Sequence, residues 1–484
     1  MESAGSLPAN GRRCTDARRR PKLSDSTATR REKKTAGKPR PFILLRERLA
    51  ADPQLRLLVI VVLMAAGFLT IFLANNVVSH IDTDLWVYRN QRVFPTYPPI
   101  GNDFRVGNYN PSYYLAHNGF TSIAPDGSYP SIYPPMVAFF GLPYTLFSPQ
   151  TAYLIHVALL ILVNLACLLI TVWMVKKFFL VPGGLSDIAA NVVSIVLFFA
   201  SSFYLFSSYF FAYSMERGNT DIFALFFCLL ALLVLVRRPE HLWLQVILLS
   251  VAVHLKIYPI VLFPLLFFKH RFKIILPALA VNVAMLFVLG PKMALAFYRS
   301  LTAGGGGAGI GNAWSNVANH ASYSFTMGID NSGSEYLTVT FFMIWAAAFL
   351  VPLVVWGISC IALWMKKYSA SNAIMGFMIS VPLMNLLPTM SMDYRLVILA
   401  VVICFLLAMI IKQFIQKFTW FDLFQMILLM GVLLMLSRSY AFVDESLAFI
   451  RNKYVWVLLV EVLLGVNILR SLKAPSLPAA EKSK

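Results

Sequence analysis

Long apolar runs, separated by short polar segments, follow one another from residue 57 to residue 469. Most of them approach the ~20 residues that an α-helix needs to cross a bilayer. The pattern therefore predicts a helical membrane protein with about 12 transmembrane segments. We expect these segments at residues 57–79, 151–175, 186–210, 219–236, 242–255, 257–268, 273–290, 338–365, 373–389, 394–411, 420–437 and 454–469.

Two neighbouring runs, 242–255 and 257–268, are at or below the lower length limit for crossing a bilayer. Lys256 and Pro259 interrupt the apolar sequence between and within them. They form either two thin spans or one re-entrant hairpin. Both choices leave the number of crossings even, so the orientation of the later segments is the same.

The composition supports this class of protein. Apolar residues make up 58% of the 484 residues and charged residues only 13%, whereas about a quarter of a typical soluble domain is charged. The short alternating segments of a membrane β-barrel are not seen. The predicted fold class is thus an all-α polytopic membrane protein with extracytoplasmic loops.

The net charge of +19 sets the expected orientation. Basic residues are concentrated in the N-terminal tail and at alternate ends of the spans, which is the distribution that keeps loops in the cytoplasm. Both termini are therefore expected inside the cell. The expected parts are a disordered basic tail (1–56), a membrane domain (57–470) with large outer loops at 80–150 and 291–337, and a C-terminal tail (471–484). Weak binding of the first tail to anionic lipid is an alternative role.

Several other site types are disfavoured. The cysteines have no CxxC spacing, and the glycine-rich stretch 304–311 follows no strand and precedes no lysine, unlike a nucleotide-binding loop. The outer histidines His80, His117 and His320 are scattered. We therefore expect no metal site, no cofactor and no nucleic-acid partner.

Two carboxylates, Asp82 and Asp84, follow the first span directly. A carboxylate shielded from water can accept a proton from an attacking hydroxyl group, so Asp84 is a candidate general base. Asp82 is equally placed to take this role. The alternative is that both are solvated loop residues or helix caps.

A second polar segment precedes the span at 219–236. Asn219 is a candidate helix cap, and a helix N-terminus beside Arg217 favours anions such as phosphate. Alternatively, Arg217 pairs with Asp221 or Glu216, or extends to the membrane surface.

Two further cations lie in apolar surroundings on the expected outer side. Lys256 lies in the middle of the 242–268 hairpin, and Arg395 lies at the start of the span at 394–411. Ionisable groups at membrane depth are costly and usually functional. Their partner is either a phosphate or a structural carboxylate, with Asp393 nearest to Arg395.

Five sequence patterns, in this order, resemble glycosyltransferase family 87 of the GT-C superfamily of multispanning glycosyltransferases. The patterns are Asp84-Leu85-Trp86-Val87-Tyr88, Tyr133-Pro134-Pro135, Gly218-Asn219, Leu255-Lys256-Ile257-Tyr258-Pro259 and Asp393-Tyr394-Arg395-Leu396. The resemblance covers roughly residues 57–410 and implies a GT-C-like helical bundle.

The resemblance also implies an activity. A hexose, typically mannose, would move from a polyprenyl-phosphate donor to a glycolipid or glycan acceptor at the outer face of the plasma (inner) membrane, with inversion and Asp84 as base. The expected donor-phosphate ligands are Arg217, Asn219, Lys256 and Arg395. The expected substrate contacts are Trp86, Tyr88, Tyr133, Asp221, Tyr258 and Asp393.

Two other functions remain as alternatives. A transporter or flippase of lipid-linked substrates shares broken helices and buried charges, but no repeat relates the halves of this chain. A polysaccharide polymerase or ligase is expected to carry one very large outer loop, whereas the polar residues here are divided between two.

Overall fold

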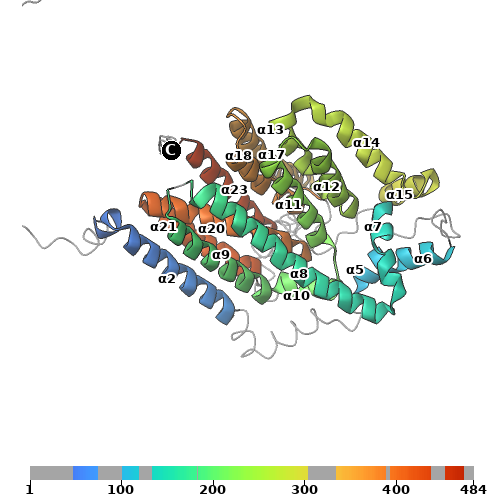
Figure 1. The fold of residues 1–484 in the computed structure, drawn as a ribbon, viewed down its shortest axis with the longest axis horizontal. Coiled ribbons are helices and arrows are strands. Elements are labelled where there is room, and N and C mark those ends of the chain that lie inside the picture. Colours follow the sequence, from blue (N-terminus) through green and yellow to red (C-terminus); the bar gives the residue numbers. More distant parts are fainter. Residues whose placement is uncertain are drawn as a thin grey trace, which may run out of the picture. The chain divides into compact units, whose positions relative to one another are not determined.

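The computed structural model describes residues 47–74, 101–118, 133–182, 184–303, 334–388, 393–437 and 453–473. All regular secondary structure in these ranges is helical, which confirms the predicted all-α class for the described part of the chain (Figure 1). Residues 49–484 form one compact unit.

Seven helical segments among the described residues are long and apolar enough to cross a membrane. They are Pro53–Phe72, Pro149–Leu180, Asp187–Ser207, Ala346–Trp364, Tyr394–Gln416, Trp420–Ser437 and Lys453–Lys473. Two bent helix pairs raise the number to nine if each pair forms one span. The chain is therefore a multi-pass integral membrane protein, and the expected total of about 12 crossings stays a prediction.

The seven segments fall on predicted runs, and local sequence explains where several of them begin. Helix α2 (Pro53–Phe72) has proline at its first position and Asp52 as N-cap, whose side chain accepts from Gln54 N and Leu55 N. Ser148 caps α8 (Pro149–Val175) in the same way. Proline and a capping side chain both suit the first turn, where backbone N–H groups lack partners. The other spanning helices are α9 (Asp187–Ser207), α17 (Ser334–Trp364), α20 (Leu399–Gln416), α21 (Trp420–Ser437) and α23 (Lys453–Lys473).

The short runs at 242–268 form α12 (Leu242–Leu255), η5 (Tyr258–Leu262) and α13 (Phe263–His270). Helix α12 has only 14 residues and α13 only 8, so neither is long enough by itself to cross. Helix α12 packs along α11 (Asp221–Arg237). The choice between two thin spans and a hairpin therefore stays open.

Short helices make up the described part of the predicted outer loop 80–150, as expected from its prolines. They are α5 (Asn102–Phe104), η2 (Arg105–Tyr109), α6 (Asn110–Asn118), α7 (Pro135–Phe140) and η3 (Leu142–Leu146). The remaining elements are η4 (Lys176–Leu180), α10 (Tyr209–Arg217), η6 (Arg271–Ile274), α14 (Ile275–Leu286), α15 (Pro291–Ala303), α18 (Ala370–Ser380), α19 (Leu383–Leu386) and η7 (Asp393–Ile398).

Helix α20 lies at the centre of the compact unit. It packs against α2, α8 and α9 and also against α21 and α23, and nearly all of its residues are buried. By contrast, large apolar side chains of α2 and α9, such as Leu58, Val62 and Phe199, are exposed. Exposed apolar side chains in such number are unfavourable in water but are normal where a helix faces lipid.

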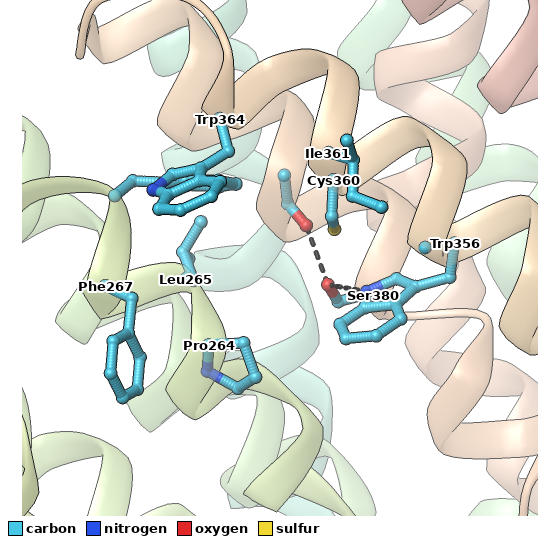
Figure 2. A pocket seen from close by; sticks show the side chains of 11 residues that line it. Pro264, Leu265, Phe267, Trp356, Cys360, Ile361, Trp364 and Ser380 are labelled. Atoms are coloured by element: carbon cyan, nitrogen blue, oxygen red, sulfur yellow. Dashed lines mark hydrogen bonds between the residues drawn. The ribbon is translucent and has the colours of Figure 1, made fainter. Parts of the chain in front are cut away.

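An apolar cavity of about 280 Å³ lies between α13, α17 and α18 (Figure 2). Its polar contacts are internal: Trp356 Nε1 donates to Ser380 Oγ at 2.8 Å, and Ser380 Oγ donates to the Gly376 carbonyl at 2.7 Å. No charged side chain lines it. The chemistry of the molecule is therefore to be sought elsewhere.

Candidate functional site

A sharp break between α10 and α11 positions the polar residues of the site. The two helices meet at 105°. Gly218, at the break, has φ +64°, which is a left-handed conformation that L side chains rarely adopt. A Cβ atom there would also lie 2.7 Å from Phe104 Cβ. The sequence thus needs glycine at this position for both conformation and space.

Backbone carbonyls around the break accept hydrogen bonds from α8 and from the start of α5. Tyr153 Oη donates to Met215 O at 2.7 Å, and Gly101 N donates to Glu216 O at 2.7 Å. The Glu216 carbonyl is one that the end of α10 leaves without a helical partner, whereas the Met215 carbonyl also accepts from Gly218 N at 3.1 Å. The break is therefore held by the start of α5 and by a spanning helix together.

His156 of α8 adds a third contact to the break. Its Nε2 lies 3.0 Å from the Gly218 carbonyl oxygen, which only accepts, so Nε2 carries the proton. In the neutral ring Nδ1 then accepts from Tyr144 Oη at 3.0 Å. Burial raises the pKa of Tyr144 to about 12, so this hydroxyl stays a donor. His156 is thus a fixed structural link between η3 and the break.

Asp103 of α5 faces the polar residues of the break. Arg217 Nη2 lies 2.5 Å from Asp103 Oδ1, and Asn219 Nδ2 donates to Asp103 Oδ2 at 3.0 Å. Both carboxylate oxygens are therefore engaged. Arg217 therefore pairs with a carboxylate of α5, and not with Asp221 or Glu216 as the alternatives proposed.

Asn219 has a different role from the one expected. Helix α11 begins at Asp221, with Thr220 at the N-cap position and no side-chain capping bond. The prediction that Asn219 caps this helix is therefore wrong. Asn219 precedes the N-cap residue by one position, and its Oδ1 accepts a hydrogen bond from Asp221 N at 3.2 Å. Through this bond Asn219 connects Asp103 with Asp221.

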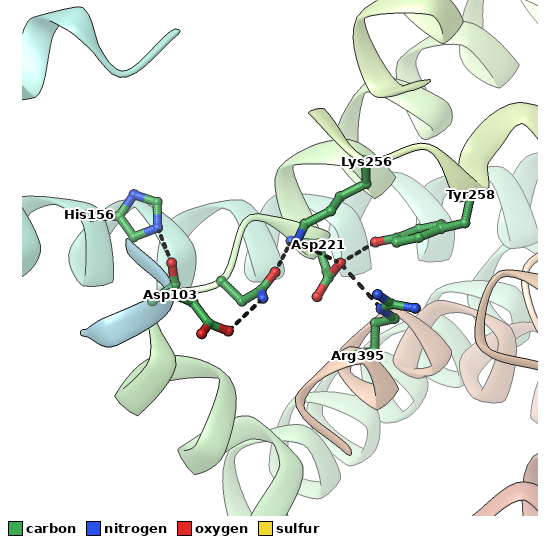
Figure 3. Close-up of polar contacts among 8 residues, drawn as sticks. Asp103, His156, Asp221, Lys256, Tyr258 and Arg395 are labelled. Atoms are coloured by element: carbon green, nitrogen blue, oxygen red, sulfur yellow. Dashed lines mark hydrogen bonds and ion pairs between the residues drawn. The ribbon is translucent and has the colours of Figure 1, made fainter. Parts of the chain in front are cut away.

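Asp221 is the centre of the second half of the site (Figure 3). Lys256 Nζ and Arg395 Nε each lie 3.8 Å from Asp221 Oδ1, and Tyr258 Oη donates to the same oxygen. The Asp221 side chain is fully buried, and the side chains of Lys256 and Arg395 are 5% and 14% exposed. Three segments far apart in the sequence thus bring two cations to one carboxylate.

Aromatic rings pack against both cations. Lys256 Nζ lies 4.0 Å from the centroid of the Tyr133 ring, and Arg395 Cζ lies 4.9 Å from that of Tyr258. Cations over ring faces within about 6 Å are attracted by the ring quadrupole. Two of the expected substrate contacts, Tyr133 and Tyr258, therefore hold the cations in place.

The ion pairs leave capacity for another anion. A separation of 3.8 Å exceeds the 2.7–3.2 Å of a hydrogen bond. Lys256 has three N–H donors, and its ion-pair partner Asp221 Oδ1 lies beyond hydrogen-bond distance. Asp221 Oδ2 and Glu216 Oε2 are buried without a hydrogen-bond partner among the described residues, but as acceptors they suit a hydroxyl group rather than an anion. The pair of cations can therefore take up a phosphate oxygen without first breaking a direct hydrogen bond between Lys256 and Asp221.

Some expected site residues lie outside the described part of the chain. They include both candidate bases, Asp82 and Asp84, and the aromatic residues Trp86 and Tyr88. Asp393 begins η7, but its side chain is outside the described part. Their roles stay predictions. Among the described residues no group of three or more His, Cys, Asp or Glu could hold a metal ion.

Sequence reasoning overlooked Asp103, His156 and Tyr144. Asp103 is a further carboxylate of the predicted outer loop 80–150, and Gly101-Asn102 before it is a signal for a turn. His156 lies in an otherwise apolar span, where a polar side chain needs a partner. Both signals were present in the sequence, but neither indicates which partner the side chain finds.

A family model described as glycosyltransferase family 87 matches residues 132–388, slightly more than half of the chain. The chain belongs to glycosyltransferase family 87. The match includes the break at Gly218 and the Asp221, Lys256 and Tyr258 positions, and it ends before Arg395. Family membership implies a glycosyltransferase that acts on a sugar donor and an acceptor. No curated protein and no solved structure matches the chain.

Proposed function

We propose that this family 87 glycosyltransferase transfers a hexose, with mannose favoured, from a polyprenyl-phosphate donor to a glycolipid or glycan acceptor. The reaction inverts the anomeric configuration and takes place at the outer face of the plasma membrane. The observation that carries the proposal is the convergence of Lys256 and Arg395 on Asp221 within a membrane protein.

The charge arrangement supports a phosphate as leaving group. When the sugar leaves a polyprenyl phosphate, negative charge develops on the phosphate oxygens. Buried, preoriented cations stabilise such charge more strongly than exposed ones do, because little water screens them. Lys256 and Arg395 fulfil this condition. Arg217, which pairs with Asp103 at 2.5 Å, is proposed as a third phosphate ligand.

The base is proposed to be Asp84, with Asp82 as the alternative. It removes the proton of the acceptor hydroxyl as the oxygen attacks the anomeric carbon, and the bond to the lipid phosphate breaks. Asp103 is less suited to this task, since both of its oxygens already accept hydrogen bonds from Arg217 and Asn219. The proton of the acceptor hydroxyl thus ends on the base, and the negative charge ends on the lipid phosphate.

Sugar transfer by the purified protein in lipid nanodiscs tests the proposal. Polyprenyl-phosphate mannose is the donor, and a membrane glycolipid extract supplies acceptors. We expect Asp84→Asn to lower the rate about 10²–10⁴-fold, the usual effect of a lost general base. Lys256→Gln is expected to lower it about 10²–10³-fold, as for other lost electrostatic groups. Lys366→Gln, at an exposed lysine, is the matched control and leaves the rate unchanged.

Three results discriminate between the readings. Transfer that persists in Asp84→Asn moves the base to Asp82. Wild-type rates in Lys256→Gln contradict the phosphate-binding role. Absence of transfer by the wild type, together with passage of the lipid-linked sugar across the bilayer, replaces the transferase by a transporter.

A further inference from the structure

A polar cavity lies at the other end of α20 from the candidate site. Its volume is about 350 Å³, and residues of η4, α18, α20, α21 and α23 line it. Lys412, near the C-terminal end of α20, lines this cavity, whereas Arg395 of the candidate site lies just before the N-terminal end of the same helix. At ~1.5 Å per residue the two are about 25 Å apart along the helix. The cavity is therefore separate from the candidate site by nearly the thickness of a bilayer core.

Basic residues outnumber acidic ones in this cavity. Lys412, Lys417 and Arg470 line it, and Asp422 is the only carboxylate among its lining residues. Asp422 is already used, because its Oδ1 accepts from Arg470 Nη1 at 2.7 Å and its Oδ2 accepts from Thr419 Oγ1 at 2.6 Å. Two positive charges thus remain without a counterion in the lining.

The two lysines have no carboxylate within ion-pair distance among the residues that the structure describes. Lys412 is partly buried, and its Nζ lies 5.8 Å from the centroid of the Phe179 ring. A partly shielded ammonium group in an apolar setting gains from an anionic partner. The cavity therefore has the charge for an anion and enough volume for a phosphate group.

The location identifies the kind of anion. The cavity lies where α20 ends at Gln416, α21 begins at Trp420 and α23 ends at Lys473. Ends of spanning helices lie at the level of lipid headgroups, where tryptophan is enriched. Basic pockets between such helix ends are suited to anionic lipid headgroups.

We propose that this cavity binds a phosphate-bearing anion, in the form of the headgroup of an anionic membrane lipid. Lys412 and Lys417 contact the phosphate, while Arg470 stays paired with Asp422. By the predicted orientation of the chain this is the cytoplasmic leaflet. The site does not depend on the proposed transfer reaction, since none of its residues belongs to the candidate site.

Binding of phosphatidylglycerol by the full chain in neutral detergent tests the proposal, with bound lipid counted by native mass spectrometry. We expect tighter binding than for phosphatidylcholine. A lysine near an anionic headgroup contributes about sixfold in affinity, so Lys412→Gln with Lys417→Gln is expected to weaken binding about 30-fold. Lys366→Gln with Lys367→Gln removes two exposed lysines outside the cavity and is the charge-matched control.

Two additional variants guard against a folding defect. Lys417→Gln changes only an exposed side chain, and it is expected to weaken binding about sixfold with an unchanged melting temperature. Lys412→Arg keeps the charge and is expected to bind as the wild type. Equal binding of the two lipids, or wild-type affinity in the double variant, overturns the proposal. Lysine-dependent binding of inorganic phosphate as tight as that of the lipid overturns the assignment to a lipid.

Discussion

Replacement of Asp221 by asparagine is the most direct test of how the candidate site is held together. Asparagine keeps the size of the side chain and an acceptor for the Tyr258 hydroxyl group, but it removes the negative charge. Lys256 and Arg395 then remain buried, with side chains 5% and 14% exposed, and both lose their ion pair. The change therefore isolates the electrostatic contribution of one carboxylate.

The expected magnitude follows from the geometry. At 3.8 Å and an effective dielectric constant of 20, each cation attracts the carboxylate by about 4 kcal/mol. The cost of burying three charges offsets much of this gain. Removal of one partner nevertheless costs about 3–5 kcal/mol, because the remaining cations stay out of water. We expect Asp221→Asn to lower the free energy of unfolding by this amount.

The measurement is the free energy of unfolding in mixed micelles, titrated with a denaturing detergent. Asp187→Asn is a matched control, since Asp187 also lies in the first turn of a helix but is exposed. Both variants lose a favourable interaction with the helix dipole, worth about 0.3–1 kcal/mol. Only Asp221→Asn loses two ion pairs. Equal destabilisation by the two variants refutes the reasoning.

Three further predictions concern the same region. Gly218→Ala and Gly184→Ala each place a side chain at positive φ, which costs about 1–2 kcal/mol of unfolding free energy. Only the new side chain at Gly218 also meets Phe104 of α5, which adds about 1–3 kcal/mol. Equal melting temperatures of the two variants contradict this prediction. Tyr258→Phe removes a hydrogen bond to a buried carboxylate and is expected to cost about 1.5–3 kcal/mol in unfolding free energy. Asp103→Asn and Arg217→Gln are expected to be coupled by about 0.5–3 kcal/mol in a double-mutant cycle, and additive effects argue against their ion pair.

Much of the fold could be read from the sequence because lipid imposes a simple rule on it. A spanning helix needs an apolar run of defined length, so the predicted runs at 420–437 and 186–210 coincide closely with α21 and α9. The rule says nothing about bends. The 105° break at Gly218 is held by hydrogen bonds from Gly101 and from Tyr153 of α8, and no local pattern indicates these contacts.

The candidate site was predictable to a similar extent. Lys256 and Arg395 stood out because a cation in an apolar run is costly, and the structure brings them to the same carboxylate. The partner was not predictable, since Asp221 is distant from both in sequence and Asp393 was the nearer choice for Arg395. Asp103 was missed because it lies in a loop that contains several carboxylates of similar appearance.

The central position of α20 has a consequence for how the protein is made. The chain is synthesised from its N-terminus, so α2, α8 and α9 are in the membrane before α20, whereas α21 and α23 follow it. When α20 first leaves the insertion machinery, lipid must cover the side that α21 and α23 later occupy. Release of the nascent chain before residue 453 would therefore leave α20, the most enclosed spanning helix among the described residues, in contact with lipid on one side.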